Sequence, residues 1–172
     1  LDGLARVERN LGNYARSEDL YMQAIAIREK TLGPQHPSTA AAHNNIAQLY
    51  AEQGLNTKAI ESYTKAAETY RKAGMLHHPD WGIVSINIGA LYERIGDLDK
   101  AEAYLMGGLN IIRQKIGSET LYAGLALSNL SLVKKERGDI KAALRLNEEA
   151  RTISLSELGS RHPNTAAATN NS

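Results

Sequence analysis

The chain has 172 residues, enough for one ordinary globular domain with its own core. Apolar residues make up 42% and charged residues 23%, close to the soluble average, which argues against disordered and fibrous classes. The 20 Lys and Arg residues against 19 Asp and Glu give a net charge of +1, so the basic excess typical of nucleic-acid binding is absent. There is no cysteine, which excludes disulfides, thiolate metal sites and cysteine nucleophiles.

No apolar run approaches the roughly 20 residues that a membrane-spanning helix needs. We therefore expect neither a membrane nor a nucleic acid among the partners. The chain begins at Leu1 instead of a methionine and ends with Asn170-Asn171-Ser172, so both ends look like cuts in a longer protein. We expect a cytoplasmic location, which the absence of cysteine fits but constrains only weakly.

The sequence repeats itself with a period of 42 residues. Glycines show the period first, at Gly12, Gly54, Gly96 and Gly138. Asparagines keep the same step at Asn45, Asn87, Asn129 and Asn171. Small residues do so at Ser17, Ala59, Ala101 and Ala143, and His-Pro pairs at His36-Pro37, His78-Pro79 and His162-Pro163. Several coincident registers of this kind indicate a repeat architecture.

Each period contains two predicted helices, because its apolar residues follow three-and-four spacing, as Ile46, Leu49 and Tyr50 do. A proline after each histidine suits a first helical turn, and each register glycine ends a first helix. The first helices are expected near residues 38–53, 80–95 and 122–137, with the end of one at 1–11 and the start of another at 164–172. The second helices are expected near residues 14–32, 57–73, 99–116 and 141–158.

No strand pattern of any length occurs, so the predicted fold is all-α. One helical hairpin cannot bury its apolar faces alone, and stacking equivalent hairpins into a solenoid does. We assign one domain, 1–172, made of a partial repeat at 1–33, full repeats at 34–75, 76–117 and 118–159, and a partial repeat at 160–172. Gly107-Gly108 falls inside a predicted helix, which we interpret as close helix packing, with a hinge as the alternative.

One stretch carries a family resemblance. Residues 32–50 read LGPQHPSTAAAHNNIAQLY. They closely resemble the kinesin light chain type of tetratricopeptide repeat, with its LGxxHPxVAxxxNNLAxLYxxxG core and 42-residue period. The resemblance covers the whole chain and is weakest in the third full repeat, where Thr120-Leu121 replaces His-Pro. It implies a right-handed superhelix whose concave wall, built from the first helices, binds extended peptides or partner proteins.

In arrays of this type an asparagine of each first helix forms a ladder that hydrogen-bonds a peptide backbone. The matching residues are Asn45, Asn87, Asn129 and Asn171, and the first partial repeat has Gly3 instead. An amide offers a donor and an acceptor, which suits a backbone of any sequence. The alternative is that these amides bond to neighbouring helices and only shape the stack. The other residues expected on this wall are Asn44, Gln48, Glu52, Ile86, Ala90, Arg94, Ser128, Leu132 and Lys135, with Arg6 and Arg9 in the first partial helix.

No pattern points to catalysis, a metal or a cofactor. His77-His78-Pro79-Asp80 is the one cluster that resembles metal ligands, but no third clustered Cys or His joins it, and His78 belongs to the repeat as a helix cap. There is no Gly-rich phosphate loop, because Gly107-Gly108 lacks the Lys-Ser/Thr that follows in such loops. We therefore expect no enzyme, no metal and no cofactor. Trp81 is interpreted as core filling, with an exposed partner anchor as the alternative.

We predict a protein–protein interaction module that binds an extended peptide or partner segment in the concave groove. The alternative is a regulatory or structural array that contacts another domain of a larger signalling protein, such as the sensor region of a signalling ATPase. Unstacked helices at the two cut ends also predict end-to-end self-association of the fragment.

Overall fold

The computed structural model describes residues 1–160, with side-chain surroundings up to Ser156, and this part contains only helices and the turns between them. The helices are α1 (Asp2–Asn10), α2 (Tyr14–Thr31), α3 (Pro37–Glu52), α4 (Asn56–Lys72), α5 (Pro79–Arg94), α6 (Leu98–Lys115), α7 (Leu121–Glu136) and α8 (Ile140–Ser160). Every predicted helix within the described residues is confirmed to within two residues at each end. The helix start predicted at 164–172 lies outside the described residues.

The residues before the first helices cap them. The Nδ1 atom of His36 accepts a hydrogen bond from the backbone N–H of Ser38 at 3.1 Å, and His78 does the same for Asp80 at 3.2 Å. Thr120, which replaces histidine in the next repeat, accepts from the N–H of Ala123 through its hydroxyl at 3.3 Å. Each cap satisfies a backbone donor that a helix start leaves unpaired. The predicted capping role of His78 is confirmed, and His36 caps its helix in the same way.

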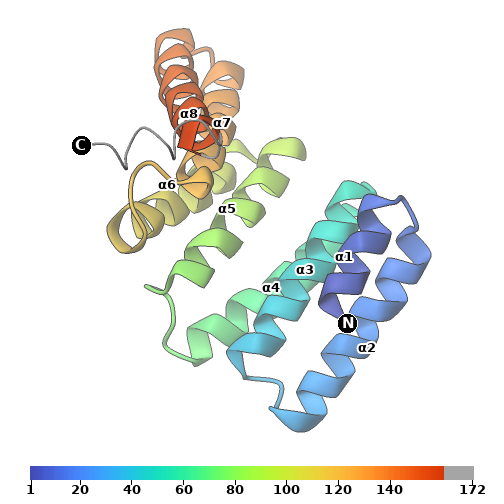
Figure 1. Cartoon of the computed structure of the whole chain (residues 1–172). Helices are drawn as coiled ribbons and strands as arrows, with labels where there is room; N and C mark the ends of the chain where they lie inside the picture. Colours follow the sequence, from blue (N-terminus) through green and yellow to red (C-terminus); the bar gives the residue numbers. More distant parts are fainter. Residues whose placement is uncertain (161–172) are drawn as a thin grey trace, which may run out of the picture.

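The register glycines make the turns inside the helix pairs. Gly12, Gly54, Gly96 and Gly138 have φ of 79°, 73°, 84° and 79°. Only glycine adopts this left-handed region without strain, so these residues end the first helices and reverse the chain. The result is four antiparallel pairs, α1–α2, α3–α4, α5–α6 and α7–α8 (Figure 1).

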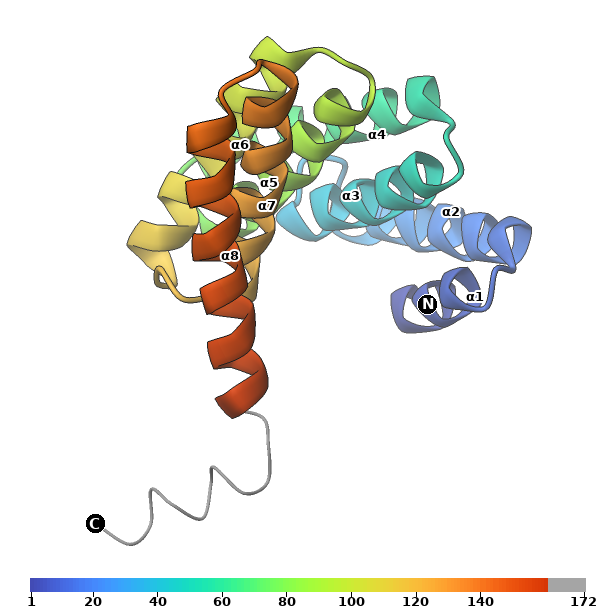
Figure 2. The ribbon, with the colours of Figure 1, turned by 90° about the horizontal axis from the view of Figure 1, so that it is seen from above.

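The four pairs stack in chain order, and each first helix also contacts the first helix of the next pair. Successive pairs are turned relative to one another, so that α8 runs across the direction of α1 and α2 (Figure 2). This arrangement confirms the predicted all-α solenoid of helix hairpins.

The core consists of two clusters of buried side chains that meet at α5. The first extends from Ala5 to Leu91 and the second from Ile86 to Ile153. Within the second, α5 and α6 touch through glycine: a Cβ on Gly108 would lie 2.7 Å from the carbonyl oxygen of Gly82. A Cβ on Gly107 would meet nothing within 4 Å. Close packing therefore explains Gly108 but does not explain Gly107.

Candidate peptide-binding groove

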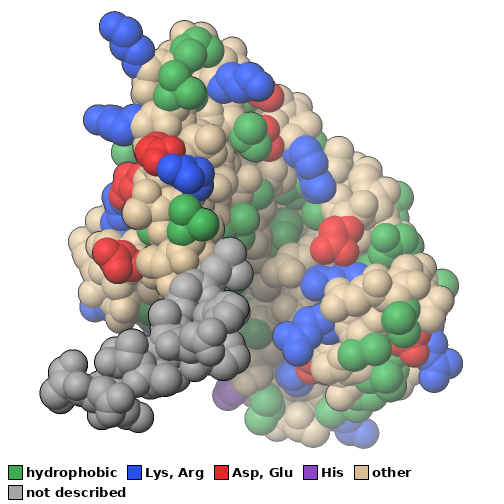
Figure 3. Space-filling model, turned by 45° about the horizontal axis from the view of Figure 1, so that its top comes forward, with side chains coloured by type: hydrophobic (Ala, Val, Ile, Leu, Met, Phe, Trp, Pro, Cys, Tyr) green, Lys and Arg blue, Asp and Glu red, His purple; other side chains and the backbone are tan. Residues whose placement is uncertain are grey.

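Two adjoining hollows lie against the first helices. One, of about 500 Å³, is lined from α1, α3, α5 and α7, with Tyr21 of α2. The other, of about 340 Å³, is lined from α3, α5 and α7, with Tyr63 of α4. They share Gln48, Asn87 and Leu125, so they form one continuous hollow, which we call the concave groove. Figure 3 looks into the space between the two ends of the array, where side chains of both charges border the opening.

The first two asparagines of the ladder are hydrogen-bonded to the preceding first helix. The Nδ2 group of Asn45 donates to Oδ1 of Asp2 at 3.4 Å, and that of Asn87 donates to Oδ1 of Asn44 at 3.1 Å. In each case the acceptor lies 43 residues earlier, one position before the equivalent site of the previous repeat. These two amides therefore shape the stack while they line the groove.

Asn129 lines the groove without such a bond. The residue 43 positions earlier is Ile86, whose side chain has no acceptor. No described residue forms a hydrogen bond with the Asn129 side chain, which is half-buried. Both the donor and the acceptor of this amide are available to a ligand.

The structure places most, but not all, of the predicted wall residues in the groove. Asn44, Asn45, Gln48, Glu52, Asn87, Ala90, Arg94, Asn129, Arg6 and Arg9 line it. Ile86 does not: only 1% of it is exposed, because it packs against α6 in the second core cluster. Leu132 and Lys135 lie beside α8 in a separate hollow with Ile140 and Leu144, because no further described helix covers that end. Ser128 is half-buried outside the groove lining, and Asn171 lies outside the described residues.

Charged groups near the first two pairs hold the groove's shape. Arg28 donates two hydrogen bonds to the carboxylate of Asp2, at 3.0 and 2.5 Å, and this pairing lowers the pKa of Asp2. Nε of Arg9 lies 3.5 Å from Glu52 and Nη1 of Arg9 donates to Gln48 at 3.3 Å. Since Asp2, Arg9 and Gln48 line the groove, its surface between α1 and α3 is polar.

The centre of the groove is apolar, and the residues that make it so were not among the expected wall residues. Ile83, Tyr122 and Leu125 line the α5–α7 side of the groove, and Tyr122 and Leu125 are 41% and 47% exposed. Ile83 and Leu125 occupy one register position, 42 residues apart, which was the available signal. The groove therefore combines amides, arginines and a central apolar surface.

The described residues contain neither a metal-binding cluster nor a membrane-spanning helix. No group of three or more His, Cys, Asp or Glu side chains in that part of the chain is placed to hold a metal ion. None of its helices has the length and apolar character needed to cross a membrane.

Stacked antiparallel helix pairs with a 42-residue period make this chain a helical-repeat protein of the solenoid class. The family model described as tetratricopeptide repeat matches residues 1–72 and 82–156. The chain belongs to the tetratricopeptide repeat family, and its repeats are of the kinesin light chain-like type. Repeats of this family generally mediate protein–protein interaction, and the fold is a non-catalytic one.

The chain is similar to the clustered mitochondria protein homolog of Homo sapiens, with 24% identity over 163 residues, which are 94% of this chain and 12% of that protein. It is also 25% identical over 146 residues to the secreted RxLR effector protein RXLR-C07 of Plasmopara halstedii, covering 85% of this chain and 45% of that protein. Among solved structures, BtubC (BKLC) from P. vanneervenii superimposes with a TM-score of 0.78 at 22% identity, over 94% of this chain and 64% of that one. The chain thus spans a minor part of these curated relatives, and the structural likeness shows a shared fold.

Proposed function

We propose that the chain binds an extended segment of a partner protein in the concave groove. The observation that carries this proposal is the continuity of the groove across all four first helices, with amides at regular steps along it. An extended peptide presents backbone N–H and C=O groups at regular steps too, and amides can pair with both.

The groove predicts the kind of segment. Oδ1 of Asn45 and of Asn87 is left to accept from a ligand N–H, because their Nδ2 groups already donate to the stack. Ile83, Tyr122 and Leu125 offer apolar contact in the middle, where a hydrophobic side chain of the partner would be buried. Arg6 and Arg94 at the two ends favour carboxylates outside that centre.

A second candidate is a regulatory or structural array that contacts another domain of its own protein. It is supported by the small share of the clustered mitochondria protein homolog, 12%, that the chain matches. The same groove would then hold a segment in cis. We place either function in the cytoplasm, a setting that a cysteine-free chain tolerates.

End-to-end association of the chain with a second copy also stays a prediction. Its support is the apolar surface left at both ends, with Leu4 and Val7 on α1 and Ile140 and Leu144 on α8 each 47% exposed or more.

Asn129→Ala and Asn87→Ala test the groove as a pair. A peptide selected by display against the wild-type protein serves as the probe. We expect Asn129→Ala to weaken its binding about fivefold, the value of one hydrogen bond, while the free energy of unfolding stays within about 0.5 kcal/mol of wild type. Asn87→Ala should weaken binding and also cost about 1 kcal/mol of stability, because Asn44 loses its donor.

Isothermal titration and chemical denaturation measure the two quantities. If the Asn129→Ala variant bound the peptide as tightly as the wild type, a ligand role for Asn129 in the ladder would be contradicted, even if Asn87→Ala still weakened binding. A stability loss in both variants without a binding loss would assign the amides to packing alone.

A further inference from the structure

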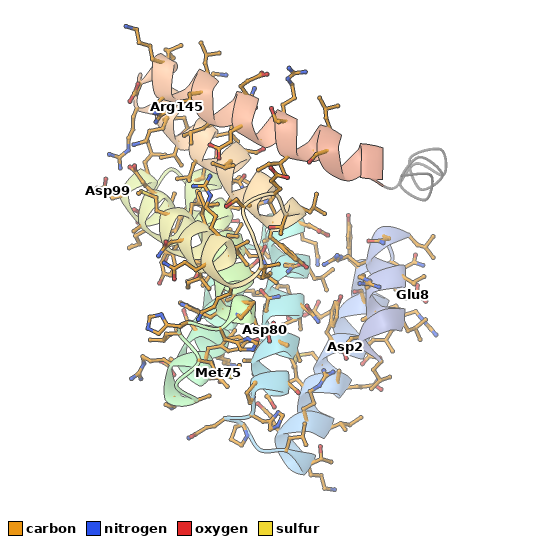
Figure 4. All side chains as sticks on the ribbon, turned by 60° about the vertical axis from the view of Figure 1, so that its left-hand side comes forward. Asp2, Glu8, Met75, Asp80, Asp99 and Arg145 are labelled. Atoms are coloured by element: carbon orange, nitrogen blue, oxygen red, sulfur yellow. The ribbon has the colours of Figure 1, made fainter. Side chains whose placement is uncertain are left out.

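A second cavity, separate from the groove, lies on the side of the second helices. It has a volume of about 340 Å³ and lies between α4, α5 and α6. The α4–α5 link, in which Figure 4 labels Met75, contributes Leu76 to its lining. Its apolar walls are Tyr63, Trp81, Ile88, Leu91, Tyr92 and Tyr104. Tyr63 and Leu91 also line the concave groove, so these two side chains separate the two hollows.

The repeats allow this α4–α6 pocket to be compared with the equivalent places before and after it. Between α2 and α3, Tyr50 donates a hydrogen bond to Glu18 at 2.8 Å. Between α6 and α7, the same register positions hold Lys134 and Glu102, which form an ion pair. Between α4 and α5 they hold Tyr92 and Ile60, which cannot form a polar bridge. Tyr92 instead stacks on Tyr104, with ring centroids 5.8 Å apart.

A second bridge is also missing at the α4–α6 pocket. Arg113 of α6 pairs with Glu149 of α8. One period earlier the equivalent residues are Arg71 of α4 and Gly107 of α6, and glycine has no side chain that could replace the carboxylate of Glu149. The surroundings of Gly107 are open, because a Cβ there would meet no heavy atom within 4 Å. Arg71 forms no ion pair with any described residue, including Glu68 one turn earlier on α4.

We propose that the α4–α6 pocket receives one bulky apolar side chain of a partner protein segment, with an adjacent carboxylate of that segment paired to Arg71. The aromatic walls supply apolar contact, and one buried anchor of this kind dominates many protein interfaces. The carboxylate takes the place that Glu149 occupies beside Arg113. The equivalent hollow between α6 and α8 lacks a free counterpart of Arg71, because Arg113 is already paired with Glu149 there and Lys134 with Glu102.

Trp81 provides the readout. It is the only tryptophan of the chain, it lines the pocket, and its ring lies 6.3 Å from Tyr70. The probe is a blocked hexapeptide with one phenylalanine followed by two aspartates in a glycine–serine background, and the control peptide carries two asparagines in place of the aspartates. We expect a saturable change of Trp81 fluorescence at millimolar probe, and an affinity about fivefold weaker for the control peptide.

Matched variants separate the pocket's charge from its shape. Gly107→Glu supplies the missing carboxylate and should weaken probe binding about fivefold, whereas Gly107→Gln should leave it unchanged. Ala67→Leu imports the residue found one period later, Leu109, and should abolish binding by filling the pocket. Glu68→Gln should strengthen binding, because it removes the one rim carboxylate. Glu149→Ala, in the equivalent hollow, should leave the Trp81 response to the probe unchanged, because Trp81 lines only the α4–α6 pocket.

Three results would overturn the proposal: no saturable response of Trp81 at millimolar probe, equal weakening by Gly107→Glu and Gly107→Gln, or loss of the response in Asn129→Ala. The last would place the probe in the concave groove. Thermal denaturation of each variant checks the fold. If Ala67→Leu fails to fold, the comparison of Gly107→Glu with Gly107→Gln still tests the proposal, because the open surroundings of Gly107 accept a side chain.

Discussion

Single side chains decide which rungs of the asparagine ladder are already bonded. Asp2 and Asn44 supply acceptors to Asn45 and Asn87, whereas Ile86 supplies none to Asn129. The 42-residue register predicted the positions of the rungs. It could not predict their partners, because the acceptors lie 43 residues away, an offset that depends on how neighbouring helices are set against each other.

Gly107 and Gly108 are adjacent in α6, but replacing each by alanine should change the stability in opposite directions. Gly107→Ala should stabilise the protein by about 1 kcal/mol, since the site is open and alanine is the better helix former. Gly108→Ala should destabilise it by about 1–3 kcal/mol, because the new Cβ would lie 2.8 Å from Cγ1 of Ile86 and force α5 and α6 apart. Denaturant unfolding of the two variants measures both changes. Destabilisation by Gly107→Ala would show that this glycine serves as a hinge.

At the scale of helices, local signals were sufficient for the fold. The histidine caps and the turn glycines are read directly from the sequence, since each acts within a few residues of itself. The contacts between each second helix and the first helix of the next pair were not predictable in this way. Whether Glu102 meets Lys134, or Ile60 meets Tyr92, follows from residues about 32 apart that only the stacked pairs bring together.

The pairing of Asp2 with Arg28 joins α1 to α2, and Asp2 also accepts from Asn45 of α3. Asp2→Asn should therefore lower the free energy of unfolding by about 1 kcal/mol at neutral pH. The pKa of Asp2 is lowered from its ordinary 3.8, chiefly by the hydrogen bond from Arg28. Its contribution is thus complete above that value and is lost as pH falls through the lower folded-state pKa.

Denaturant unfolding from pH 7 down to acid measures this effect. The difference between wild type and Asp2→Asn should be constant near neutrality and shrink below about pH 4. Asp19→Asn is the matched control, because Asp19 accepts only from Gln23 of its own helix. A difference that grows on acidification would contradict the ion pair's role.

At the scale of the whole molecule, the two core clusters divide the array at α5. Repeat arrays have approximately local stability, so each half should lose structure separately. Tyr21→Ala should remove about 3–5 kcal/mol from the first cluster, and Leu127→Ala about 2–5 kcal/mol from the second. Both residues are at most 1% exposed.

Hydrogen exchange followed by mass spectrometry measures the protection of each helix separately. Tyr21→Ala should speed exchange in α1–α4 and leave α7–α8 protected, and Leu127→Ala should do the reverse. Uniform loss of protection in either variant would show one cooperative unit instead.

The claim that the groove between the first helices is the binding surface has a direct test in methyl NMR. Ile83 and Leu125 line the groove, whereas Ile27 on α2 is 52% exposed and lines neither the groove nor the α4–α6 pocket. With a display-selected partner peptide added to labelled protein, we predict that the methyl signals of Ile83 and Leu125 shift and that the Ile27 signal stays. Shifts at Ile27, with Ile83 and Leu125 unchanged, would contradict the groove as the site of binding.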